Sequence, residues 1–258
     1  MPKKKTKREW TNEHTLLCER CGYVIEGLDT EGKCPECGKP IAESLLGDYP
    51  GSPWQNNFNW IEIVRSWFLI LRHPIQQSRA LKVNQQETFA MTWLLNFLAA
   101  ALITPATIVF LTAISIDSGF IANNVFGVIV YTLVAMGYWI MASSYATLAS
   151  PRVQLIAQWR KKRLTPPAAR TAVAFASVGL TLPPVMISAS LMLVSTMIVL
   201  DLGGPIFGQV LSLIWLLSFP ASVVFFEVLL WLACRRLVHR NRHDRDPEPE
   251  REPEEVRS

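Results

Sequence analysis

Charged side chains are scarce over more than half of this 258-residue chain. Between Thr88 and Ala233 only nine occur, namely Asp117, Arg152, Arg160, Lys161, Lys162, Arg163, Arg170, Asp201 and Glu227. Half of all residues are hydrophobic, and the mean hydropathy is +0.22. Successive apolar runs of about 20 residues match the length of membrane-spanning helices, and no soluble core needs several of them in a row. The composition therefore argues against a soluble globular protein and predicts an α-helical integral membrane protein.

Catalytic motifs are missing as well. The sequence has no H-E-x-x-H, G-x-S-x-G or P-loop pattern, and its apolar runs hold a single carboxylate, Glu227, and no histidine. Nothing in the sequence therefore points to an enzyme, and we expect a non-enzymatic protein. The basic N-terminus also lacks the apolar segment of a cleavable signal peptide, so we do not expect the N-terminal region to be exported.

Four long apolar segments predict a bundle of four transmembrane helices. They cover about 88–114, 120–149, 171–200 and 206–234. Prolines lie inside three of these runs, at Pro105, at the pair Pro183 and Pro184, and at Pro220. Each proline removes a backbone hydrogen bond, and we expect neighbouring helices to satisfy the carbonyl groups that are freed.

The basic residues predict how these spans are oriented. Of the 25 Lys and Arg residues, 12 precede the first span, six lie within 151–170 and seven follow the fourth span. The other two connections contain no basic residue and carry Asp117 and Asp201. Because positive loops stay on the cytoplasmic side, we expect a multi-pass protein of the bacterial inner membrane with both termini in the cytoplasm.

The stretch "WIEIVRSWFLILRHP" precedes the spans and has apolar residues at helical spacing. It is too short to cross a membrane, so residues 60–87 are predicted to form amphipathic helices at the interface, with Trp60 and Trp67 at headgroup depth. The alternative is a helix buried against the bundle. The preceding residues 43–59 contain Gly, two Pro and Asn and predict a linker.

Four of the five cysteines, Cys18, Cys21, Cys34 and Cys37, form two C-x2-C pairs in "CERCGYVIEGLDTEGKCPECG". Each pair places two thiolates on one tight turn, and Gly22 and Gly38 let the backbone fold towards the sulfurs. Two such turns facing each other complete a tetrahedral S4 metal site. Two disulfides are the alternative, which the reducing cytoplasm disfavours. Zinc and iron both suit four thiolates.

The segment 16–42 resembles the short rubredoxin-like knuckle module found in rubrerythrin-type proteins, and it also resembles zinc ribbons fused to membrane domains in uncharacterised bacterial proteins. The shared features are C-x2-C-G-Y and C-P-x-C-G. The resemblance implies a small β module in which the four cysteines are the ligands. The di-iron Glu-x-x-His pairs of rubrerythrin-type proteins are absent here. We therefore expect structural zinc, with iron as the alternative.

Basic residues near the membrane predict contacts with anionic lipid headgroups. The candidates are Lys3, Lys4, Lys5, Arg160, Lys161, Lys162 and Arg163. The cysteine module itself carries more acidic than basic residues, which argues against nucleic acid as a partner. Residues 1–15 are predicted to be a loose basic segment, and residues 235–258 a disordered charged tail.

Glu227 is the one intramembrane candidate for a function. It lies two helical turns before Arg235, so it could instead meet a basic group of the 152–170 connection near the interface. The layout of the membrane part also resembles the Yip family, which has five spans where four are predicted here. We expect a membrane-anchored zinc ribbon that binds a cytoplasmic protein partner. The alternatives are a small transporter or channel that uses Glu227, and a rubredoxin-like iron electron carrier.

Overall fold

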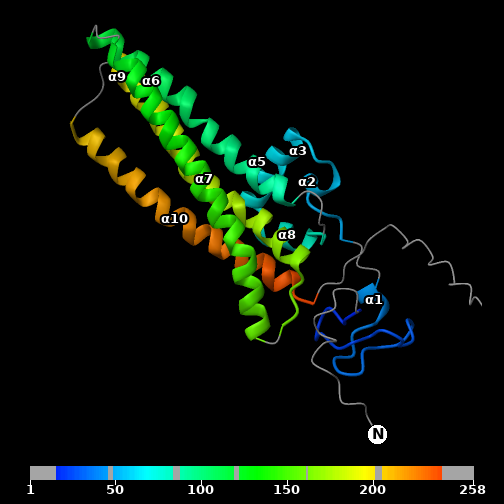
Figure 1. Ribbon diagram of the computed structural model, residues 1–258. Helices are drawn as coiled ribbons and strands as arrows, with labels where there is room; N and C mark the ends of the chain where they lie inside the picture. The colour runs from blue at the N-terminus through cyan, green and yellow to red at the C-terminus, as the bar shows by residue number, and fades with distance from the viewer. Residues whose placement is uncertain are drawn as a thin grey trace, which may run out of the picture. The chain divides into compact units, whose positions relative to one another are not determined.

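The protein consists of two compact units (Figure 1). One is built from the chain up to Asp48 and from His239 on, the other from Tyr49–Val238. The structure is a computed structural model, and it describes residues 16–45, 49–83, 88–118, 122–160, 162–200 and 205–239. The predicted loose segment 1–15 lies outside these residues, as does the predicted tail from residue 240 on.

The first unit holds the cysteines and has little regular structure in its described part. It contains the one-turn helix α1 (Ala42–Leu45) and two isolated antiparallel bridges, Leu17 with Val24 and Lys33 with Pro40. No strand forms among residues 16–45, so the prediction of a small β module is wrong for this part. The two residues of each bridge flank a tight turn, and pairing stops after a single residue on either side.

All the regular secondary structure in the described part of the second unit is helical (Figure 1). Its elements are α2 (Pro53–Asn56), α3 (Trp60–Arg72), α4 (Pro74–Ala80), α5 (Thr88–Ala101), α6 (Ile103–Ser118), α7 (Ala122–Trp159), α8 (Pro166–Ala176), η2 (Ser177–Thr181), α9 (Leu182–Val199) and α10 (Pro205–Leu237).

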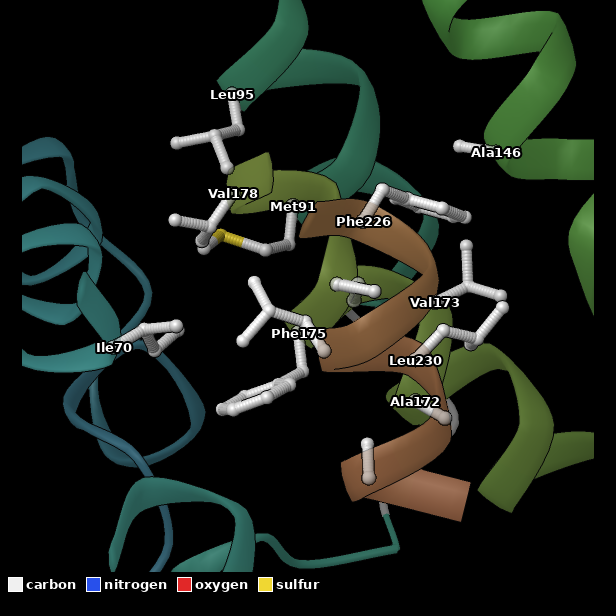
Figure 2. Close-up of a cluster of buried hydrophobic side chains, with 14 of the residues drawn as sticks. Ile70, Met91, Leu95, Ala146, Ala172, Val173, Phe175, Val178, Phe226 and Leu230 are labelled. Atoms are coloured by element: carbon white, nitrogen blue, oxygen red, sulfur yellow. The ribbon is translucent and has the colours of Figure 1, made fainter. Parts of the chain in front are cut away.

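The long helices associate in two groups. Helix α6 packs against α7 and α9, and further along the unit α8 and η2 pack against α5 and α10 (Figure 1). Figure 2 shows the core of the second group, where Phe175 and Val178 lie beside Met91 of α5 and Leu230 of α10. Alanines of α8 such as Ala172 let the backbones approach closely, as is common between helices in a membrane.

Three helical stretches of the described chain are long and apolar enough to cross a membrane. They are Thr88–Phe110, Pro166–Met197 and Leu217–Leu237. The first stretch lies within the predicted span 88–114, the second begins five residues before the predicted 171–200, and the third ends three residues after the predicted 206–234. The three stretches indicate a helical, multi-pass membrane protein. The predicted second span, 120–149, is not among them. It falls on α7, whose first side chains lie outside the described residues and whose later part carries Ser143, Tyr145, Thr147 and Arg152.

Helix α7 also runs further than the sequence predicted. We expected a loop from residue 151, but the helix continues through Pro151 to Trp159. Leaving the apolar part of the membrane does not end a helix, and one proline inside it removes a hydrogen bond and strains the preceding turn without necessarily ending the helix. Likewise α10 extends to Leu237, past the predicted start of the tail at residue 235.

The proline pair in the third span is accommodated by a change in helix type. Pro183 and Pro184 cannot donate to the carbonyls of Gly179 and Leu180, four residues earlier. The chain forms the 3₁₀ helix η2 here, so that the Leu182 N–H donates to the Gly179 carbonyl, and the Tyr138 hydroxyl of α7 donates to that of Leu180. The expected satisfaction by a neighbouring helix is thus confirmed for the Leu180 carbonyl, whereas the Gly179 carbonyl is satisfied within its own helix.

Helix α3 has features of both alternatives that the sequence left open, an amphipathic helix at the membrane interface and a helix buried against the bundle. One face, with Ile63, Ser66 and Ile70, is fully buried, and Trp67 Nε1 donates to Thr181 Oγ1 of η2 at 2.6 Å. The opposite face exposes an apolar strip, namely Trp60, Ile61, Val64 and Phe68. The helix therefore packs against the bundle and also presents an apolar surface that suits the membrane interface.

The second half of the predicted linker is folded. Trp54 is fully buried, and its backbone N–H donates to Ser66 Oγ at 3.1 Å. The Gln55 side chain donates to the Lys82 carbonyl at 2.7 Å and accepts from the Lys82 N–H at 3.0 Å. A buried tryptophan and amide fix this segment against α3 and the end of α4, which the proline and glycine content did not reveal.

Candidate metal centre

The two halves of the cysteine unit have the same backbone structure, repeated after 16 residues. In the first half Cys18 N–H donates to the Tyr23 carbonyl at 2.8 Å, and Gly22 N–H to the Cys18 carbonyl at 2.8 Å. The corresponding bonds of the second half join Cys34 to Lys39 at 2.8 Å and Gly38 to Cys34 at 2.9 Å. Each half is therefore one knuckle, as the C-x2-C spacing predicts.

The glycines after each pair are required by the geometry of these turns. Gly22 has φ +78° and Gly38 has φ +70°, values in the left-handed region that side chains disfavour. Each of these residues turns the chain back, so that the N–H of the first cysteine can reach the carbonyl of the residue after the glycine. The two knuckles then bring their paired sulfurs to one point.

The four sulfurs form one compact cluster. Cys18 Sγ lies 3.5 Å from Cys37 Sγ, and Cys21 Sγ lies 3.6 Å from Cys34 Sγ. All four lie within 4.8 Å of one another. Sulfurs bound 2.3 Å from one zinc ion are about 3.8 Å apart in a regular tetrahedron, whereas a disulfide needs about 2.05 Å. The spacing fits four thiolates around one metal ion and does not fit two disulfides.

The hydrophobic cluster in the described part of this unit is small. Its buried hydrophobic cluster consists of Cys18, Cys34, Ile25 and Ile41, and both isoleucines occupy the same place in their knuckles. Ile25 N–H donates to the Leu16 carbonyl and Ile41 N–H to the Gly32 carbonyl, each at 3.0 Å. Two of the four buried side chains are therefore themselves metal-ligand candidates.

The pKa values of two of the thiols are shifted in opposite directions. Burial raises the pKa of Cys18, but hydrogen bonds from the Cys21 and Arg20 N–H groups outweigh it and lower the pKa to about 7. Burial and the neighbouring sulfurs raise the pKa of Cys21 to about 12, since a second negative charge is unfavourable beside the first. A bound metal cation offsets the repulsion between thiolates, so metal binding can deprotonate all four thiols.

Glu227 is held by two residues of α7. Its Oε1 accepts from the Tyr145 hydroxyl and from Arg152 Nη2, each at 2.5 Å. The side chains of Arg152 and Glu227 are 42% and 41% exposed. The expected meeting with a basic group from 152–170 is thus confirmed, although Arg152 lies on a helix rather than in a loop. The Tyr145 contact was missed, since the sequence does not show which face of α7 meets α10.

The basic residues that were predicted to contact lipid headgroups differ in their exposure. Arg160 and Lys162 are exposed, whereas Arg163 is only 7% exposed. Lys3, Lys4, Lys5 and Lys161 lie outside the described residues. Contact of Arg160 and Lys162 with lipid headgroups stays a prediction.

Comparisons with protein-family models, with curated proteins and with solved structures find no match to this chain. The fold and the cluster nevertheless define a class, a helical multi-pass membrane protein with a four-cysteine group that could hold a metal ion. The knuckle resemblance is supported by the geometry of the four sulfurs, while the resemblance to the Yip family gains no support from a family match.

Proposed function

We propose that this protein is a membrane-anchored interaction module, in which a zinc-bound four-cysteine unit recruits a protein partner to the cytoplasmic face of the membrane. The observation that carries the proposal is the arrangement of Cys18, Cys21, Cys34 and Cys37, whose sulfurs lie within 4.8 Å of one another. Four thiolates around one zinc ion leave no coordination position for water or substrate. Such a site stabilises a fold and does not catalyse.

The membrane part supports an anchoring role. We propose that α7 is a fourth span beside the three candidate stretches, which places both termini on one side of the membrane. The distribution of basic residues makes that side the cytoplasm, where free thiols persist and zinc can bind. The ion pair of Glu227 with Arg152 supports a structural rather than a transport role for this carboxylate.

The surface of the cysteine unit indicates the chemistry of the partner. Residues 16–45 contain six acidic and three basic side chains, and zinc with four thiolates adds a net charge of about −2. Residues 26–31 are all exposed, and this loop carries Glu26, Asp29 and Glu31 beside Leu28, which is 37% exposed. An exposed apolar side chain in an acidic loop suits a basic segment of a protein.

Metal analysis of the purified full-length protein tests the first half of the proposal. We expect one zinc ion per chain and no absorption band in the visible range. Iron at that ratio, with a visible band that disappears reversibly on reduction, would replace the interaction module with an electron carrier.

Photo-crosslinking in cells tests the second half. A photoreactive residue at position 28 is expected to give a discrete protein adduct. The adduct should disappear when Glu26→Lys and Glu31→Lys are combined, and it should persist in the control Glu43→Lys, an exposed carboxylate outside this loop. An adduct that survives the double charge reversal, or no adduct in the wild-type protein, would refute a basic partner at this loop.

A further inference from the structure

A groove of about 660 Å³ opens between α5, α7 and α8 of the helical unit. Its polar lining residues are Thr88, Thr92, Thr147, Ser150, Gln154 and Arg170. Its apolar walls include Phe89, Leu148, Pro151 and Val173. The groove lies at the start of α5 and of α8, and therefore at one end of two candidate spans.

Arg170 is placed in this groove by a helix that is otherwise buried. Every other residue from 167 to 181 is buried, whereas Arg170 is exposed. The surrounding alanines of α8 pack against neighbouring helices, so the one long polar side chain of this stretch extends into the groove that it lines. A charged residue in so apolar a helix has a large desolvation cost unless its charged end reaches a polar environment.

The charge of Arg170 is not neutralised within the described part of the chain. The ion pairs found there are Lys39 with Glu19, Arg65 with Glu62, and Arg152 with Glu227. None of the described residues that line the groove is a carboxylate. Among these residues nothing competes for the guanidinium as an anion would, and its planar set of donors fits the oxygens of a phosphate group.

The exposed apolar side chains at the edges of the groove favour a ligand in which the anionic group is attached to an apolar chain. Phe89 is 61% exposed and Leu148 is 68% exposed, and the lining is mostly apolar. A free phosphate ion would engage the arginine and leave these side chains uncovered. An anionic phospholipid satisfies both, with its phosphate at headgroup depth and an acyl chain along the helices. Lipids of this charge are concentrated in the leaflet that faces basic loops.

We infer that this groove is a binding site for one anionic phospholipid, with the phosphate on Arg170 and an acyl chain over Phe89 and Leu148. The Ser150 hydroxyl, which accepts from Gln154 Nε2, and the second amide proton of Gln154 line the same groove and can donate to the remaining phosphate or headgroup oxygens. The inference rests on the protein crossing a membrane and is independent of the metal centre and its partner.

Native mass spectrometry of the full-length protein tests this site. The protein is released from detergent with added phosphatidylglycerol or, in parallel, phosphatidylcholine. We expect one phosphatidylglycerol molecule to remain bound under conditions that strip phosphatidylcholine. The variant Arg170→Gln should weaken this retention by about ten- to a hundredfold, because it removes hydrogen bonds to a charged group. Millimolar inorganic phosphate should not displace the lipid.

Two further variants make the test specific. Arg236→Gln removes an exposed charge at the end of α10, outside the groove, and should retain the lipid like the wild-type protein. Thr147→Trp fills the groove from an exposed position while keeping Arg170, and should lose the lipid without a change in melting temperature. Unchanged retention in Arg170→Gln or Thr147→Trp, an equal loss in Arg236→Gln, or displacement by phosphate would each overturn the inference.

Discussion

The folding of the cysteine unit is predicted to depend on its metal ion. Apart from the cysteines, the buried apolar side chains of residues 16–45 are Leu17, Ile25 and Ile41, and full burial of three such side chains contributes about 5–9 kcal/mol. Metal binding by four thiolates contributes about 10–16 kcal/mol at neutral pH. The metal term thus exceeds the apolar one, and a segment below about 40 residues usually needs a metal site or disulfides to fold.

The perturbation is removal of the metal from the full-length protein with a strong chelator, or the variant Cys21→Ser. Hydrogen exchange measured by mass spectrometry should show loss of amide protection across residues 16–41. The same measurement should show unchanged protection in α8 and α10, which have their own apolar core. Adding zinc back after chelation should restore protection, whereas it should not do so in Cys21→Ser.

The fifth cysteine provides the control. Cys234 lies on α10 and is outside the four-sulfur cluster, so Cys234→Ser should keep both the metal and the protection of residues 16–41. Retained protection in the chelated wild-type protein, with metal loss verified by analysis, would show that the unit folds without its metal. That result would refute the reasoning from the size of the buried cluster.

Two substitutions in the helical unit test its close contacts. At Gly179 an added Cβ would lie 2.7 Å from the backbone nitrogen of Phe226. Gly179→Ala should therefore lower the free energy of unfolding, measured in detergent, by about 1–3 kcal/mol. In the same assay Gly137→Ala, where an added Cβ meets open space, should be neutral or slightly stabilising. The half-exposed pair of Glu227 and Arg152 should show a coupling of about 1 kcal/mol or less in a double-mutant cycle with Glu227→Gln and Arg152→Gln, and a coupling above about 2 kcal/mol would refute the reasoning from its exposure.

The metal cluster could be predicted from spacing alone, because each C-x2-C-G segment determines its own turn. The equivalent hydrogen bonds of the two knuckles, 16 residues apart, depend on local chain reversal at Gly22 and Gly38. The absence of strands was not predictable in the same way. A ribbon requires pairing beyond the turn, and here the pairing is limited to one bridge per knuckle.

The helical unit was predictable in its apolar runs but not in its contacts. The sequence marked Pro183 and Pro184 as sites of freed carbonyls, but it could not show that the hydroxyl of Tyr138 would meet the Leu180 carbonyl. The two residues are 42 positions apart, and their meeting depends on how α7 packs against the third span. For the same reason Trp54 was assigned to a linker although it is fully buried.

Arg152 and Arg170 show why a run of basic residues cannot be interpreted as a single feature. The sequence assigned both to one positive connection, which is sufficient to predict topology. In the structure Arg152 is held by Glu227, whereas Arg170 enters a groove whose described lining residues include no carboxylate. A paired guanidinium is already engaged with an acceptor, but an unpaired one beside exposed apolar side chains retains its capacity to bind an anion. The difference between these two arginines therefore arises from packing, and it places the candidate lipid site at Arg170 rather than at the loop residues that charge alone suggested.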